Sequence, residues 1–258
     1  MYHCTNGKRM RQLCSIVAIL LGLLALDAAA RTGTIRTLTG AVYEGNITLS
    51  PLGGLSININ SGGTALIPLA FLVNAKLAPS ALPATNSIHR WVVFRNGSVL
   101  PALLVRGSES EIYLEGRGVK LKPAPLDVAG VICQAGEPDQ WPAFKTGRTG
   151  VALKNGDFMD GTFRDLDSSS VGLNTVLFGY RRLPLEKDVA AVVLRALSPS
   201  AVRYQLRTAD GAVYGSKLLP AMAANDTLVI ADPVLGETHV PFSAVVEFKT
   251  LPAAPRLQ

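Results

Sequence analysis

The chain has 258 residues and a formal net charge of +6 at pH 7, and 48% of its residues are hydrophobic whereas only 6% are aromatic. Its basic residues are scattered, whereas nucleic-acid binding requires a concentrated stripe of cations against the phosphates. We therefore expect no nucleic-acid partner, and a chain of this size and aliphatic content can bury more than one hydrophobic core.

The first 30 residues have the order of a secretory signal peptide. Basic residues from Lys8 to Arg11 precede an apolar run at residues 15–26, and alanines at residues 28–30 follow it. The run is too short to cross a bilayer as a helix, and the small residues suit signal peptidase. We predict cleavage after Ala30, which leaves an exported chain, periplasmic or secreted, with no membrane span. The alternative is an uncleaved membrane anchor.

The cysteines give no disulfide framework to the exported chain. Cys4 and Cys14 lie in the predicted signal peptide, so only Cys133 remains after cleavage. Cys133 ends an apolar run, where we expect a packed thiol rather than a nucleophile.

The next 220 or so residues contain an internal repeat. Its first anchor is a turn glycine between two strand-like stretches, found at Gly40, Gly97, Gly156 and Gly211. In three copies the glycine follows asparagine or aspartate, which predicts a two-residue type I′ hairpin with positive φ at both positions.

Two further anchors follow each turn glycine in a constant order. A second glycine, which marks a bulge or bend in a strand, stands at Gly45, Gly161 and Gly215, and copy two has Pro101-Ala102 there. A proline then precedes the last apolar strand, at Pro68, Pro125, Pro184 and Pro241. We infer four diverged copies of one β unit.

Each copy holds about five short apolar or alternating runs, such as residues 151–153, 158–163, 171–173, 176–183 and 189–194 in copy three. The glycine hairpin and bend, as in VALKNGDFMDGTF at residues 151–163, resemble those of SH3-like and Sm-like barrels. The resemblance implies an all-β chain of four tandem small barrels. The units lack the Arg-Gly pair that Sm proteins use on RNA, and Leu183-Pro184 stands there instead, so an RNA role is not implied.

The unit is also similar to repeats of uncharacterised exported proteins of planctomycete-type bacteria. The alternative architecture is a four-bladed β-propeller, because blades of four strands fit nearly the same length. We place repeats at residues 31–77, 91–133, 151–195 and 203–249, with linkers at 78–90, 134–150 and 196–202. The short last linker predicts that repeats three and four are the most tightly coupled.

The acidic residues of repeat three are the one candidate metal site. Asp165 and Asp167, followed by three serines, space oxygens as calcium loops do, although the central glycine and terminal glutamate are missing. The alternative is a turn held by side-chain to backbone hydrogen bonds, which we favour. His89 and His239 are isolated in sequence and give no histidine site.

A glycan site would use exposed aromatic rings for stacking and arginines for hydroxyls. The candidate ligand-binding residues are Trp141, Tyr180, Arg181 and Arg182. Trp141 lies in a linker, where the alternative role is a wedge between repeats two and three.

The absence of catalytic motifs in the sequence predicts a non-catalytic exported scaffold or protein-interaction protein of the cell envelope, without a cofactor. A carbohydrate-binding protein is the second hypothesis. The third is a hydrolase, which would need Asp160, Asp165 or Asp188 to meet a carboxylate from another repeat. The predicted partner is thus a protein or an envelope glycan.

Overall fold

The computed structural model describes residues 30–50, 52–79, 90–116, 119–134, 142–198, 202–223 and 225–252. These residues form mostly β-strands, which confirms the all-β prediction. Residues 1–29 of the predicted signal peptide lie outside them, and so do His89 and Trp141. Within the described ranges, no helix is long and apolar enough to cross a membrane.

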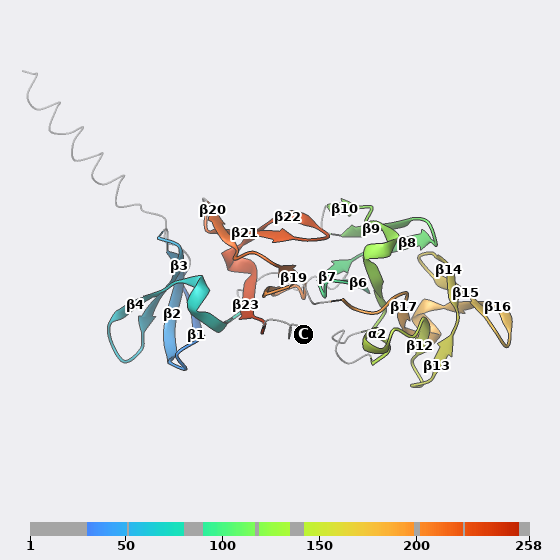
Figure 1. Ribbon diagram of the computed structural model, residues 1–258, viewed down its shortest axis with the longest axis horizontal. Coiled ribbons are helices and arrows are strands. Elements are labelled where there is room, and N and C mark those ends of the chain that lie inside the picture. Colours follow the sequence, from blue (N-terminus) through green and yellow to red (C-terminus); the bar gives the residue numbers. More distant parts are fainter. Residues whose placement is uncertain are drawn as a thin grey trace, which may run out of the picture. The chain divides into compact units, whose positions relative to one another are not determined.

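The strands fall into four groups that follow the predicted repeats, which we call segments 1 to 4 (Figure 1). Segment 1 holds β1 (Arg31–Thr37), β2 (Val42–Ser50), β3 (Gly54–Ile59), β4 (Thr64–Ile67), η1 (Leu69–Phe71) and β5 (Leu72–Leu77). Segment 2 holds β6 (Arg90–Phe94), β7 (Val99–Ala102), β8 (Leu104–Ser108), β9 (Ile112–Gly116), β10 (Val119–Leu121), η2 (Pro125–Asp127) and β11 (Val128–Ile132). Segment 3 holds β12 (Gly150–Leu153), β13 (Phe158–Asp160), β14 (Thr162–Leu166), β15 (Ser170–Thr175), β16 (Gly179–Pro184), α3 (Leu185–Asp188) and β17 (Val189–Val193). Segment 4 holds β18 (Tyr204–Thr208), β19 (Val213–Ser216), β20 (Ala221–Ala223), β21 (Thr227–Asp232), β22 (Gly236–Pro241), η5 (Phe242–Ala244) and β23 (Val245–Thr250).

The same local arrangement recurs in every segment. The last strand pairs antiparallel with the first, as β5 does with β1, β11 with β6, β17 with β12 and β23 with β18. The short helix before the last strand receives a bond from the first hairpin: Leu38 N donates to Phe71 O at 2.9 Å. Arg95, Lys154 and Ala209 donate in the same way to Asp127, Asp188 and Ala244. The predicted proline anchor therefore precedes a helical turn that holds the hairpin.

The first hairpin of each segment is not the predicted type I′ turn. Gly97 N donates to Phe94 O at 2.9 Å, Phe94 N donates to Ser98 O at 2.8 Å, and only the glycine has positive φ, at 88°. This is a three-residue loop, a type I turn followed by a left-handed glycine. Asn96 does not adopt the left-handed conformation that a type I′ turn would need. Instead, its side-chain Oδ1 accepts a hydrogen bond from Ser98 N at 3.0 Å. The same turn recurs at Gly40, Gly156 and Gly211.

In segments 2 and 3 the second strand changes sheet close to the predicted bend, whereas Gly215 of segment 4 lies inside β19. Gly161 separates β13 from β14, and these two strands belong to different sheets. Leu103 separates β7 from β8 in the same way. In segment 1 the strand stays continuous. Glycine is required at Gly45 because the neighbouring strand lies so close that a Cβ would be 1.9 Å from Asn58 O.

Three open sheets contain the strands, so the closed barrels predicted for each repeat are not confirmed. The first has the order β13-β12-β17-β11-β6-β7-β19-β18-β23-β5-β1-β2-β3-β4, the second β10-β9-β8-β14-β15-β16 and the third β20-β21-β22. The segments thus join edge to edge in the order 3, 2, 4, 1. This differs from a propeller, whose blades are separate sheets around a channel.

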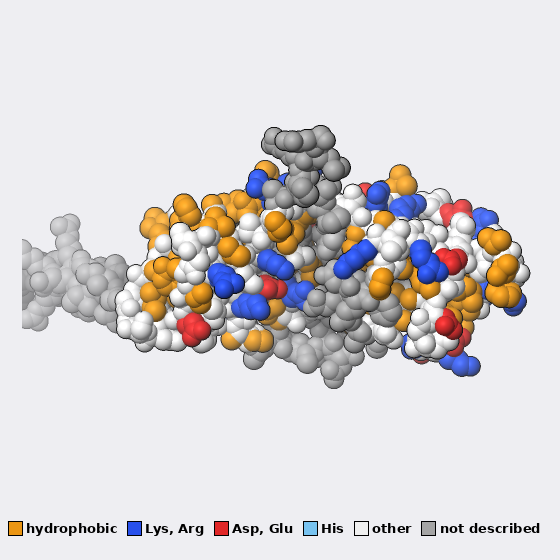
Figure 2. Space-filling view, turned by 60° about the horizontal axis from the view of Figure 1, so that its bottom comes forward, with side chains coloured by type: hydrophobic (Ala, Val, Ile, Leu, Met, Phe, Trp, Pro, Cys, Tyr) orange, Lys and Arg blue, Asp and Glu red, His pale blue; other side chains and the backbone are white. Residues whose placement is uncertain are grey.

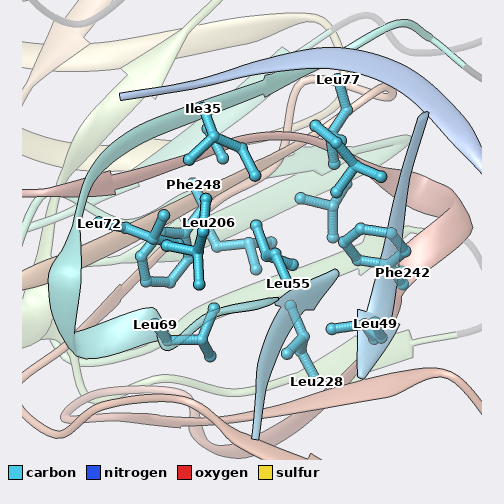
Figure 3. Close-up of a cluster of buried hydrophobic side chains, with 14 of the residues drawn as sticks. Ile35, Leu49, Leu55, Leu69, Leu72, Leu77, Leu206, Leu228, Phe242 and Phe248 are labelled. Atoms are coloured by element: carbon cyan, nitrogen blue, oxygen red, sulfur yellow. The ribbon is translucent and has the colours of Figure 1, made fainter. Parts of the chain in front are cut away.

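Two pairs of segments result, and the prediction that repeats three and four are most tightly coupled is wrong. The last strands of segments 1 and 4 pair through β5 and β23, and those of segments 2 and 3 through β11 and β17. Segments 1 and 4 share one hydrophobic core, in which Figure 3 labels Ile35, Leu49, Leu55, Leu69, Leu72, Leu77, Leu206, Leu228, Phe242 and Phe248. Segments 2 and 3 share a second core.

A short helix, α2 (Pro142–Thr146), lies in the predicted linker between segments 2 and 3. Its Phe144 is fully buried and packs with Val93 and Ile132 of segment 2 and with Ala191 and Val193 of segment 3. The wedge considered for Trp141 is therefore a role that Phe144 fills.

A buried carboxylate joins the two pairs. Asp232 is 3% exposed and accepts hydrogen bonds from Asn96 Nδ2 at 2.9 Å and Ser98 Oγ at 2.5 Å, both in segment 2. It also accepts the N–H groups of Gly215, Val234 and Leu235 at 3.3, 2.8 and 3.0 Å. Beside it, β7 and β19 share a single residue pair. Asp232 thus accepts two side-chain hydrogen bonds across this joint, and Gly215 N adds a third by donating to Ser98 Oγ at 2.9 Å.

Candidate binding site

The hairpin formed by β15 and β16 carries three of the four candidate ligand-binding residues, Tyr180, Arg181 and Arg182. β16 is the edge strand of the second sheet, and its first four residues are exposed. The turn is held by Thr175, whose Oγ1 accepts from Phe178 N at 3.1 Å and donates to Gly179 O at 3.0 Å. The side chains at the tip therefore point away from the body of the sheet.

The tip is apolar and uncovered. Val176, Leu177 and Phe178 are 98%, 83% and 58% exposed, and hydrophobic side chains are visible at the end that carries β15 and β16 (Figure 2). The sequence predicts a strand at residues 176–183, but β16 begins only at Gly179. An apolar run does not distinguish a packed strand from an exposed tip, which is why the sequence missed this surface.

Behind the tip, candidates for two different functions form one polar cluster. Tyr180 donates its hydroxyl to Asp165 Oδ2 at 3.2 Å. Arg182 Nη2 lies 2.5 Å from Asp167 Oδ2 and 3.2 Å from Asp165 Oδ1, the second contact being an ion pair without hydrogen-bond geometry. Gly172 makes room, since a Cβ there would lie 2.6 Å from the Tyr180 hydroxyl oxygen. Arg181 instead lies over the Phe178 ring at 5.5 Å.

Asp167 is a turn residue, in agreement with the favoured interpretation. Its Oδ1 accepts the N–H groups of Ser169 and Ser170, each at 2.7 Å. The Ser169 N–H is the largest cause that holds the pKa of the Asp167 carboxyl well below its usual range. Arg182 supplies the positive charge beside it, and the described residues contain no group of three or more His, Cys, Asp or Glu arranged to hold a metal ion.

Two of the three aspartates proposed for hydrolysis, Asp160 and Asp165, have cationic neighbours. Arg148 bonds Asp160 through Nε at 3.1 Å and Nη2 at 2.6 Å, and this bond lowers the pKa of Asp160. Asp165 contacts Arg182 as described above. These contacts do not resemble a pair of carboxylates from different segments, so they lend the hydrolase hypothesis no support.

Cys133 lines a small cavity of about 190 Å³ with Arg90, Lys154, Leu185 and Glu186. Burial raises the pKa of the thiol to about 11, although Arg90 and Lys154 act in the opposite direction. The side chain is therefore a protonated thiol at neutral pH, as expected for a packed cysteine.

A larger cavity of about 330 Å³ lies at the joint between segments 2 and 4. Its walls are mainly apolar, including Leu100, Pro101 and Leu114, and its rim holds Glu237 and His239. The two rim side chains form a pair at 3.0 Å, so His239 has a partner that its isolation in sequence did not indicate. The cavity is within the size range of small-ligand sites, and Asp210 and Tyr214 also line it.

Comparison of the chain with models of protein families, with curated proteins and with solved structures gives no match. The functional argument therefore rests on the surfaces described above.

Proposed function

We propose that this chain is a non-catalytic exported scaffold of the cell envelope, built from four SH3-like or Sm-like units, that binds a protein partner through the β15–β16 hairpin. The observation that carries the proposal is the exposure of Val176, Leu177 and Phe178 at the tip. Single exposed apolar residues are ordinary, whereas adjacent ones mark interaction sites.

The strand behind the tip favours a partner different from this chain. β16 is an unpaired edge, and such edges receive an added strand when an extended segment binds. Two copies pairing through this edge would bring Arg181 and Arg182 of one copy against those of the other. Like charges at an edge oppose such pairing, so we expect the partner to present acidic or neutral residues there.

The test compares a triple variant of the tip with a double control variant, in pull-downs from the native envelope fraction. We expect Val176→Ser/Leu177→Ser/Phe178→Ser to reduce the captured partner at least about ten-fold, because three apolar side chains lose their burial on binding. The control is Leu218→Ser/Leu219→Ser, which changes another exposed apolar pair, 66% and 40% exposed. Equal capture by the tip variant and the unmodified chain would refute the proposed site.

Glycan binding on the same hairpin is the second candidate. The observation that favours it is the position of Tyr180 over Gly172, which leaves the ring half-exposed between fixed polar groups. Binding of cell-wall polysaccharides that is lost in Tyr180→Ala but kept in the tip variant would favour this candidate over a protein partner.

A further inference from the structure

The outer face of the first sheet carries two polar rows across the seam between segments 1 and 4. Residue pairing places Arg36, Asn74, Lys249 and Gln205 side by side on β1, β5, β23 and β18. The neighbouring row is Thr34, Lys76, Glu247 and Arg207. The residues between the rows, Ile35, Ala75, Phe248 and Leu206, are 0–3% exposed and face the core. Side chains alternate along a strand, so both rows face outward.

The rows border a shallow hollow of about 360 Å³ that is rich in cations. Arg36, Lys76 and Lys249 line it and are exposed, and the half-buried hydroxyl residues Thr34 and Thr250 line it too. Figure 2 shows Lys and Arg side chains gathered over the part of the sheet that holds β1, β5 and β23. The hollow therefore presents positive charge and hydrogen-bonding groups on one continuous surface.

Within the described part of the chain, the two rows hold four cations, Arg36, Lys249, Lys76 and Arg207, and one carboxylate, Glu247. Glu247 accepts from Asn74 Nδ2 at 3.2 Å and lies 3.8 Å from Arg207 Nε. Among the described residues, no carboxylate lies within 4.0 Å of the charged nitrogens of Arg36, Lys76 or Lys249. In addition, Asn74 Oδ1 is a buried acceptor without a hydrogen-bond partner. The surface thus presents three exposed cations without a carboxylate partner in the ranges that the structure describes.

We propose that this face binds an acidic polysaccharide, with the carboxylates of the polymer on Arg36 and Lys249 and its hydroxyls on Asn74 and Gln205. Adjacent strands lie about 4.8 Å apart, so Arg36 and Lys249, two strands apart, are separated by about 10 Å. This is comparable with the length of two linked sugar rings. The cation, amide, cation, amide order therefore fits a chain with a carboxylate on every second sugar.

The residue types fit a sugar acid better than a nucleic acid. Arginine and lysine pair with carboxylates, and side-chain amides both donate to and accept from hydroxyls. Binding of single-stranded nucleic acid relies on aromatic rings on which the bases stack, and neither row contains one. The inference goes beyond the proposed scaffold role, because it assigns a ligand to segments 1 and 4 rather than to the hairpin of segment 3.

Calorimetry on the purified full chain tests the proposal with three polymers. Hyaluronan has a carboxylate on every second sugar, dextran is neutral, and single-stranded DNA is the phosphate polymer. We expect hyaluronan to bind more tightly than DNA, dextran not to bind, and Arg36→Gln/Lys76→Gln/Lys249→Gln to weaken hyaluronan binding at least about ten-fold. These side chains face solvent, so the variant should keep the circular dichroism spectrum and melting temperature of the unmodified chain.

The control removes the same number of positive charges elsewhere, in Lys120→Gln/Lys122→Gln/Lys217→Gln, whose lysines are also exposed. We expect this variant to bind hyaluronan within about two-fold of the unmodified chain, since screened distant charges contribute little. Equal weakening in both variants would mean attraction by net charge alone and would overturn the site. Failure of the unmodified chain to bind hyaluronan, or tighter binding of DNA, would overturn it as well.

Discussion

Asp232→Ala is expected to lower the free energy of unfolding by roughly 3 kcal/mol or more, because buried donors that lose their acceptor carry the full cost of desolvation. The substitution removes the acceptor of Asn96 and Ser98 in segment 2. It also removes the acceptor of the N–H groups of Val234 and Leu235 in segment 4. Urea denaturation followed by circular dichroism measures the change.

Glu237→Ala is the control on the same β21–β22 hairpin, since the Glu237 side chain is 69% exposed and pairs with the exposed His239. Exposed pairs contribute about 0–1 kcal/mol, so this variant should unfold close to the unmodified chain. If Asp232→Ala were no less stable than Glu237→Ala, the buried carboxylate would not hold segments 2 and 4 together.

Phe144→Ala is expected to cost about 3–5 kcal/mol, the usual range for removing a buried phenylalanine. The ring is fully buried between segments 2 and 3, and a Cβ on Gly130 would lie only 2.8 Å from it, so the wedge fits closely against β11. Loss of the ring leaves a cavity at the contact that both segments share. Thermal and urea unfolding measure the effect.

Phe71→Ala is the matched control for the same chemical change. Phe71 is 56% exposed in η1, so its truncation removes little buried surface and should cost less than about 1 kcal/mol. Similar losses at the two positions would mean that α2 does not pack between segments 2 and 3 as described.

Local chemistry made the turns predictable from the sequence, whereas the short helices after the prolines were not predicted. The glycines at Gly40, Gly97, Gly156 and Gly211 have positive φ. Each proline anchor precedes or begins the short helix before the last strand of its segment. Even the error in turn type is local. The side chain of Asn96 bonds the backbone two residues on, so this position does not need the left-handed conformation that a type I′ turn requires.

The pairing of segments was not predictable, because it depends on contacts between residues far apart in the chain. The local sequence of a strand edge does not specify which strand will pair with it. β23 pairs with β5, which lies far away in the sequence. Segments 3 and 4 are neighbours in the sequence, but they contribute to different hydrophobic cores. Linker length was therefore a poor guide. Asp232 precedes a proline, which indicates a turn, and nothing local marks it as buried.

In the candidate site, too, the local features were predictable and the long-range contacts were not. Asp165, Tyr180 and Arg182 were chosen for different chemistries, and only the pairing of β14, β15 and β16 brings them together. The exposed tip was missed for the opposite reason. Its apolar residues satisfy the pattern of a buried strand, and exposure becomes visible only when the end of the sheet is placed.

The pairing of segment 1 with segment 4 is the central claim, because it forms one core and the proposed polysaccharide face. Asn74 and Lys249 are direct partners on β5 and β23 and face outward. Their Cα atoms, as antiparallel partners, lie within disulfide range. In a chain that starts at Arg31 with Cys133→Ser, we expect Asn74→Cys/Lys249→Cys to form an intramolecular disulfide under mild oxidation, seen as a mass loss of two hydrogens. A folded monomer that keeps both thiols free, while Asn74→Cys/Lys187→Cys forms the bond, would contradict the account.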